Sequence, residues 1–121
     1  MITINLPWPS NRLSPNARCH WAVKSKAAKR AREDAMFAAI SAGARKLKAT
    51  RLHVTTIFAP PDARRYDADN LLARCKAALD GIADATGVDD HRFEISIKRA
   101  PPTKGGNLRV EIEVIAGDRN A

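Results

Sequence analysis

The sequence predicts one α/β domain in which a small mixed β-sheet packs with two main helices, in the order β-α-β-α-β-β. The chain has 121 residues, which suits one compact domain and is too short for two. Short stretches alternate apolar and polar side chains or are rich in β-branched ones. Two longer stretches lack proline and carry apolar residues at helical spacing. We therefore expect residues 1–121 to form a single domain.

The first two predicted elements are a strand and a long helix. Residues 2–6 alternate like a half-buried strand, which Pro7 and Pro9 then end. Residues 21–46 are rich in Ala, Lys and Arg, which favours a helix with Gly43 near its end. The alanines recur at helical spacing: Ala28, Ala31, Ala35, Ala38, Ala39 and Ala42. Such a face allows another backbone to approach closely.

A second strand and a second helix follow. Residues 51–58 are rich in β-branched types and are followed by prolines, which predicts a strand. After a polar loop, residues 69–85 predict a helix with Asp69 as N-cap and Gly87 as its stop. Its apolar stripe consists of Leu71, Cys75, Ala78, Leu79 and Ile82.

The last two predicted strands are residues 93–97 and 108–114, where apolar and polar side chains alternate. Lys104-Gly105-Gly106-Asn107 lies between them, so we expect a β-hairpin closed by a glycine turn. These glycines do not lead from a strand into a helix, so they form no phosphate-binding loop.

Charge is distributed unevenly along the chain. The net charge is +8 and the pI about 10.1, and residues 1–50 hold ten basic residues against two acidic ones. The remaining residues hold eleven of each sign. A one-sided basic field favours a polyanion, because neutralising phosphates releases their counterions. Arg18, Lys26, Lys29 and Arg30 are the candidate phosphate contacts, although a solvated helix face would have the same composition.

Several classes of protein do not fit the sequence. Cys19 and Cys75 are too few for a disulfide framework and lack metal-site spacing, so we expect reduced thiols that pack. No stretch has the pattern of a signal peptide or a membrane span, and no motif indicates an organic cofactor. We therefore expect a cytoplasmic protein without a membrane partner.

The candidate chemistry lies in two acidic clusters. Asp67 and Asp69 follow Arg64 and Arg65 at a junction between loop and helix, and Asp89-Asp90 follow the helix stop. Carboxylates bind the hard cation that phosphodiester hydrolysis uses, and adjacent arginines would hold phosphates. The structural alternative is that Asp69 caps the helix and Asp67 interacts with the positive end of the helix dipole, while Arg65 pairs with either acid. Asp89-Asp90 would then form only a turn.

Together, motifs along nearly the whole chain resemble the RusA-type crossover junction endodeoxyribonucleases, especially phage and prophage members. The motifs are Leu6-Pro7-Trp8-Pro9, residues 14–18 with His20-Trp21, Asp67-Ala68-Asp69-Asn70-Leu71, Gly87-Val88-Asp89-Asp90 and Thr103-Lys104-Gly105-Gly106. Their order and separations carry the resemblance.

The resemblance implies a homodimer that cuts paired strands of a four-way (Holliday) DNA junction in recombination and repair, with Mg²⁺ held by aspartates. By position, Asp67, Asp69 and Asp90 would bind metal and catalyse, with Asp89 in support. A catalytic lysine would be Lys76, which lies seven residues after Asp69 instead of at the closer position, held by Ala73. An i,i+4 pair with Asp80 is the structural alternative for Lys76. The DNA-binding set would comprise Arg64, Arg65, Tyr66, Asn70, Lys104 and the N-terminal basic residues named above.

Two alternatives remain open at this stage. A helix from Leu71 to Ala85 would span about 22 Å, whereas the chain from there to Asp90 can return only about 17 Å. Either the helix is short or bent, or Asp90 meets Asp67 and Asp69 across a dimer interface. The alternative function is a non-catalytic basic DNA-binding protein whose aspartates only cap helices and close turns.

Overall fold

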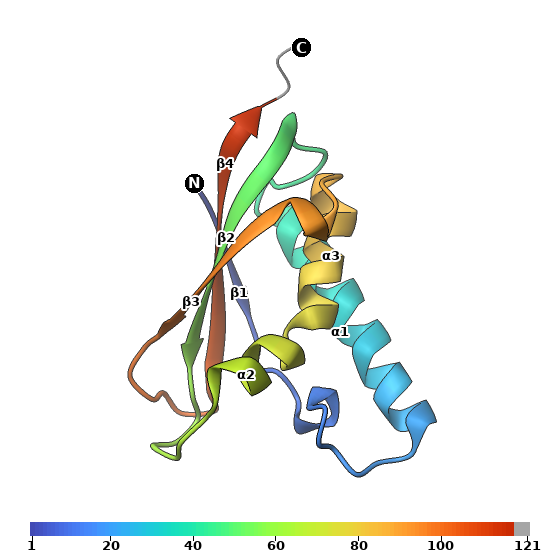
Figure 1. Ribbon diagram of the computed structural model, residues 1–121, viewed down its shortest axis with the longest axis vertical. Helices are drawn as coiled ribbons and strands as arrows, with labels where there is room; N and C mark the ends of the chain where they lie inside the picture. The colour runs from blue at the N-terminus through green and yellow to red at the C-terminus, as the bar shows by residue number, and fades with distance from the viewer. Residues whose placement is uncertain (118–121) are drawn as a thin grey trace.

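The computed structural model describes residues 1–117 as two layers, with the helices on one face of a four-stranded sheet (Figure 1). The predicted α/β class and the order of the elements are confirmed. The strands are β1 (Ile2–Leu6), β2 (Ala49–Ala59), β3 (Phe93–Arg99) and β4 (Asn107–Gly117). The helices are α1 (Trp21–Ser41), α2 (Ala68–Arg74) and α3 (Lys76–Thr86), with short 3-10 turns η1 (Asn11–Leu13) and η2 (Asp90–Arg92).

The predicted hairpin between the last two strands is wrong. The sheet order is β1-β4-β2-β3, so β2 lies between β3 and β4. Val54 of β2 pairs with Ile95 in parallel on one side and with Ile112 in antiparallel on the other. The sheet is therefore mixed, as expected, but its topology is not that of a terminal hairpin.

The connection from β3 to β4 explains the error. Ala100 N donates to Phe58 O at 2.8 Å and Thr103 N to Pro60 O at 2.9 Å, so the connection crosses the end of β2. The glycine turn does form, with Gly106 N donating to Thr103 O at 3.0 Å. However, it leads into β4 on the other side of β2, so β3 and β4 do not pair with each other. The helices that link β2 to β3 form a crossover, which is what a parallel strand pair requires.

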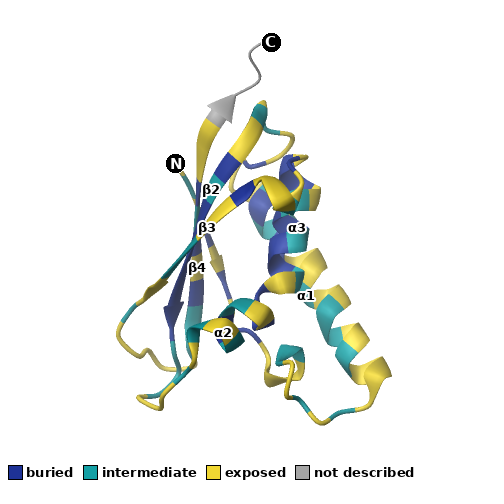
Figure 2. Ribbon diagram, viewed as in Figure 1, coloured by how far each residue is buried: buried dark blue, intermediate teal, exposed yellow. Residues whose placement is uncertain are grey.

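α1 and α3 pack together over the sheet, and their buried sides face it (Figure 2). Ala35 and Ala39 of α1 are fully buried, as the alanine pattern predicts. A Cβ atom built on Gly81 of α3 would lie 2.1 Å from Arg32 O. The two backbones therefore approach as closely as small residues permit.

We expect Gly81→Ala to lower the free energy of unfolding by up to about 2 kcal/mol. The new methyl group meets backbone that cannot move aside, which costs about 1–3 kcal/mol, and the better helix propensity of alanine offsets about 1 kcal/mol of this cost. Urea unfolding measures it. Ala77→Gly, on the same helix, gives the propensity effect alone, and a Gly81→Ala protein stabilised by that amount would contradict the close approach.

The second predicted helix is two helices. Cys75, with φ −89° and ψ −6°, ends α2 and begins α3. Asp67, and not Asp69, holds the N-cap position of α2, and its side chain makes no capping hydrogen bond. Gly87 ends α3 in the left-handed conformation at φ 77°, as predicted. The whole predicted stripe from Leu71 to Ile82 is buried.

The long helix ends earlier than predicted, whereas the two thiols are as predicted. α1 ends at Ser41, five residues before the predicted end, and Gly43 follows at φ 94°. Cys19 and Cys75 are both free thiols, and burial raises the pKa of Cys75 to about 12. Within residues 1–117, no helix combines the length and apolar character needed to cross a membrane.

Candidate functional site

The loop before α2 is fixed by Asp62. Its carboxylate accepts hydrogen bonds from Arg64 N at 3.0 Å and from the Tyr66 hydroxyl at 3.2 Å, and it pairs with the Arg64 guanidinium at 3.2 Å. Tyr66 also packs edge-on against Trp8, with ring centroids 5.3 Å apart. Burial, followed by the negative charge of Asp62, raises the pKa of Tyr66. The segment that carries Arg65 and Asp67 is therefore anchored at Tyr66.

Asp67 and Asp69 open into a hollow of about 550 Å³ on the surface. Both residues are exposed, and in the described part of the chain neither carboxylate has a hydrogen bond or an ion pair. The hollow is also lined by Arg65, Asn70 and Asn16. The sequence-predicted grouping of two carboxylates with Arg65 and Asn70 is thus present, and its acids are free to bind a ligand.

Asn70, which lines this hollow, bonds to the segment after η1. Its side-chain amide donates to Ser14 Oγ at 3.0 Å, and Ser14 Oγ also accepts from Asn16 N at 3.2 Å. The segment after η1 is therefore tied to the first turn of α2, although 56 positions separate the two bonded side chains. Asn70 serves this contact, so its predicted role in binding DNA is accompanied by a structural one.

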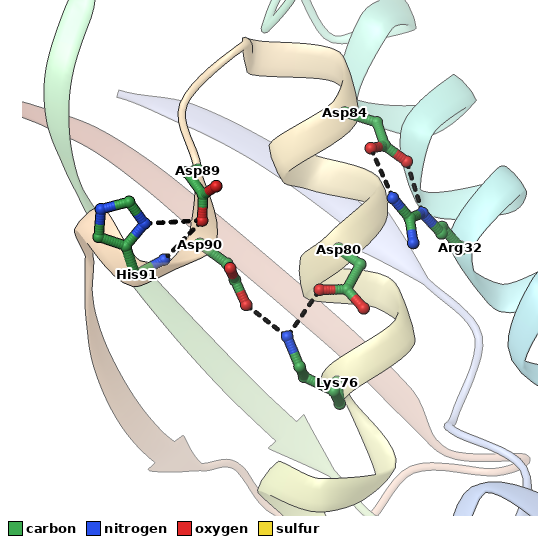
Figure 3. A network of polar contacts seen from close by, with 7 residues as sticks. All are labelled: Arg32, Lys76, Asp80, Asp84, Asp89, Asp90 and His91. Carbon is green, nitrogen blue, oxygen red and sulfur yellow. Dashed lines mark hydrogen bonds and ion pairs between the residues drawn. The ribbon is translucent and has the colours of Figure 1, made fainter.

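The second acidic cluster lies on α3 and η2, around Lys76 (Figure 3). Lys76 Nζ pairs with Asp80 at 2.7 Å and also with Asp90. These hydrogen bonds, Asp80 first and then Asp90, raise the pKa of Lys76. The predicted i,i+4 pair with Asp80 is confirmed. The turn after α3 brings Asp90 back beside Lys76.

The remaining acids of this cluster have partners of their own (Figure 3). Asp89 accepts from His91 N at 3.2 Å and contacts His91 Nδ1 at 2.8 Å, and these hydrogen bonds lower the pKa of Asp89 to about 2. Asp84 receives two bonds from Arg32, at 2.7 and 2.9 Å, which lower its pKa. With Asp80 and Asp90, these acids line a hollow of about 310 Å³.

The two acidic clusters occupy separate hollows on the described chain. Asp69 lies seven positions before Lys76, which corresponds to about 10 Å of helical rise. Across residues 1–117, no three Asp, Glu, His or Cys side chains gather as they would around a metal ion. The predicted set of Asp67, Asp69 and Asp90 is therefore not assembled within the described chain.

The predicted basic residues lie on the surface. Arg18, Lys26 and Lys29 are exposed, and the Arg30 guanidinium lies 3.9 Å from Asp34. Lys104 is exposed in the glycine turn. Arg65 has no ion pair among the described residues, whereas Arg64 pairs with Asp62. Arg65 is thus the arginine of the motif that remains available to a phosphate.

Sequence reasoning missed four charged residues that the fold places in or beside these sites, namely Arg32, Asp62, Arg74 and Asp84. Arg32 pairs with Asp84, and Arg74 is buried beneath Trp8. A signal for Arg74 was present, because it lies three residues after Leu71 and so falls on the stripe that faces the core. The pairing of Arg32 joins α1 to α3 and has no local signal.

Comparisons with known proteins place the chain beside a relative without a named activity. No protein-family model matches the chain. An uncharacterized protein of Xylella fastidiosa strain Temecula1 is 50% identical over 96 residues, which cover 77% of this chain. The match covers 63% of that relative, so the chain spans less than two thirds of its length.

Proposed function

We propose that the protein is a magnesium-dependent endonuclease of the RusA type that resolves four-way DNA junctions as a homodimer in the cytoplasm. The observation that carries this proposal is the pair of exposed carboxylates, Asp67 and Asp69, which have no partner in residues 1–117 and share a hollow with Arg65. A surface that only binds DNA gains nothing from free carboxylates, because they repel phosphate.

The residues of this hollow fit a magnesium ion in part. Magnesium keeps several waters and commonly binds only one or two protein carboxylates, which Asp67 and Asp69 supply. Bound there, it would polarise a phosphoryl oxygen and favour deprotonation of a water molecule. Asp90 is held by Lys76 and Asp89 by His91, so these two acids fit the ion only if those pairs open.

The chain's own residues then have separable tasks. Arg65 binds a phosphate of the cleaved strand with its unpaired guanidinium, which is suited to forked hydrogen bonds. The hydrogen bond between Tyr66 and Asp62 fixes the loop that lines the hollow. The hydrogen bond from Asn70 to Ser14 ties α2 to the segment after η1. Lys76 positions Asp90. The basic residues of α1 supply affinity for the DNA backbone.

The deciding experiment incubates the protein with a labelled four-way junction and with a duplex of the same sequence, each with magnesium or with a chelator. We expect cleavage of the junction in magnesium alone, at symmetric positions. Cleavage of both substrates would indicate a nuclease without branch selectivity. Retarded migration of the junction without cleavage in magnesium would favour the non-catalytic DNA-binding alternative.

The alternative of a non-catalytic DNA-binding protein has support in the structure, because several acidic residues stabilise turns and loops. Asp89 caps η2 through His91 N, and Asp62 organises the loop. Asp67 holds the N-cap position of α2 and Asp69 lies in its first turn, where negative charge favours the helix dipole, but neither makes a side-chain capping bond. The metal site of the nuclease gives both free carboxylates a ligand, whereas the binding protein gives them only this dipole interaction.

We expect the basic side of α1 to contribute affinity and not chemistry. Replacing Lys26, Lys29 and Arg30 together with Gln should flatten the dependence of log K for junction binding on log salt by up to about three ion equivalents. Binding titrations at several salt concentrations measure the slope.

A matched control replaces Arg45, Lys46 and Lys48, which are exposed beyond the other end of α1. Its net charge changes by the same amount, but we expect a smaller change in slope. Equal slopes for the two triple variants would show that net charge, and not this side of the helix, determines the salt dependence.

A further inference from the structure

Arg74 is a buried cation that has no carboxylate partner among residues 1–117. It is 5% exposed, and its Nη2 donates to Pro9 O at 2.5 Å. Its Cζ lies 5.7 Å from the centre of the Trp8 ring. Its Nε is buried without any hydrogen-bond partner in the described chain. A buried charge normally has an ionic partner, because desolvating it alone is costly.

The surroundings of Arg74 supply only weak compensation. The Pro9 carbonyl, the Trp8 ring and the end of α2 each present partial negative charge. Burial lowers the pKa of Arg74, yet a guanidinium remains charged in proteins. The position therefore has an unused donor and an uncompensated positive charge.

Arg74 lines a cavity of about 240 Å³ beneath the segment from Leu6 to Leu13. Two further arginines, Arg12 and Arg30, line the same cavity and are exposed, so positive charge extends to the surface. Asp34, the carboxylate in this lining, already lies 3.9 Å from Arg30. The remaining wall is largely apolar, with the Trp8 indole, Leu13 and Leu108.

We infer that this cavity binds a nucleotide unit, with the phosphate beside Arg74 and the base against the apolar wall. A guanidinium group matches a phosphate, which accepts forked hydrogen bonds, and three arginines line this cavity. The cavity volume of about 240 Å³ lies just below the usual range of small-ligand sites, so it suits one nucleotide unit better than a longer strand. The nucleotide is either free or at the 5′ end of a strand. This inference does not depend on cleavage at Asp67 and Asp69.

The test uses the fluorescence of Trp8. The chain has two tryptophans, and Trp21 is 75% exposed, so Trp21→Phe leaves Trp8 as the only tryptophan at little structural cost. This protein is titrated with deoxyadenosine 5′-monophosphate, inorganic phosphate, deoxyadenosine, and a pentanucleotide with and without a 5′-phosphate, at constant ionic strength. We expect a saturable change with the mononucleotide or the phosphorylated pentanucleotide, and weaker binding of the nucleoside.

In the same background, Arg74→Met should weaken nucleotide binding by about 10-fold or more, because a charge-assisted hydrogen bond is lost. Arg12→Gln with Arg30→Gln should also weaken it, and these exposed positions keep the test valid if Arg74→Met does not fold. Arg45→Met is the control for net charge. Saturation by the mononucleotide identifies the free ligand, and saturation by the phosphorylated strand alone identifies a strand end.

Absence of a saturable response, or equal weakening by Arg45→Met, would overturn the inference. Arg74 would then be a packing residue that holds the Pro9 carbonyl.

Discussion

Asp67→Asn, Asp69→Asn and Asp90→Asn should each lower magnesium-dependent cleavage of a four-way junction by about 1000-fold or more. Each change removes one charged ligand, and metal stabilisation of the transition state is worth several kcal/mol. Binding of the junction should persist or strengthen, because one repulsion toward phosphate is removed. Single-turnover cleavage and gel-shift titration on the same preparations separate the two effects.

Glu113→Gln is the matched control for these variants, because it removes one exposed negative charge from β4. It should cleave like the wild type. A variant at Asp67, Asp69 or Asp90 that cleaves at a near wild-type rate would remove that residue from the proposed metal site. Thermal unfolding of every variant checks that a loss of cleavage does not reflect a loss of fold.

Mixing inactive Asp67→Asn protein with inactive Asp90→Asn protein should restore nicking of the junction. Within one subunit the two acids lie in separate hollows, so we propose that Asp90 completes the site of the other subunit. A two-fold dimer then builds two equivalent sites, and each heterodimer regains one intact site. Random exchange predicts roughly a quarter of the wild-type number of sites.

A mixture of Asp67→Asn with Asp69→Asn serves as the control, because both changes fall in the same short segment. In a site shared as proposed, every heterodimer site still lacks a ligand, so this mixture should remain inactive. If the Asp67→Asn and Asp90→Asn mixture also stays inactive after subunit exchange, the site lies within one subunit, and the Lys76 pair must open for Asp90 to reach it.

Local patterns predicted the elements well because those patterns reflect burial. The stripe from Leu71 to Ile82 is buried as expected, and so are Ala35 and Ala39 of α1, whereas Ala42 is exposed beyond the end of that helix. The break at Cys75 left no trace in this stripe, because its dihedral angles stay in the right-handed region and the apolar spacing continues. The wrong hairpin has a similar origin: the glycine turn is a real local signal, but pairing with β2 is decided by contacts far apart in sequence.

The candidate site could be predicted by residue type but not by pairing. The sequence indicated which acids stand beside arginines, and Asp67, Asp69 and Arg65 do share a hollow. It did not indicate that Lys76 holds Asp90, or that Arg32 of α1 holds Asp84 of α3. Such pairs depend on how helices approach each other, and a single sequence does not fix that.

The position of β1 bears on how the chain acquires its fold. In the described sheet, β1 pairs with β4 alone, and Ile2 lies opposite Ile112. β1 therefore cannot pair in the sheet until β4 has been synthesised. Closing a loop of that length gives the domain non-local contacts of the kind that slow folding. During synthesis, β1 leaves the ribosome long before β4 and remains an unpaired strand with one apolar face, a state prone to association with other chains. Chaperone capture of the nascent chain should therefore include β1 and end once β4 has emerged.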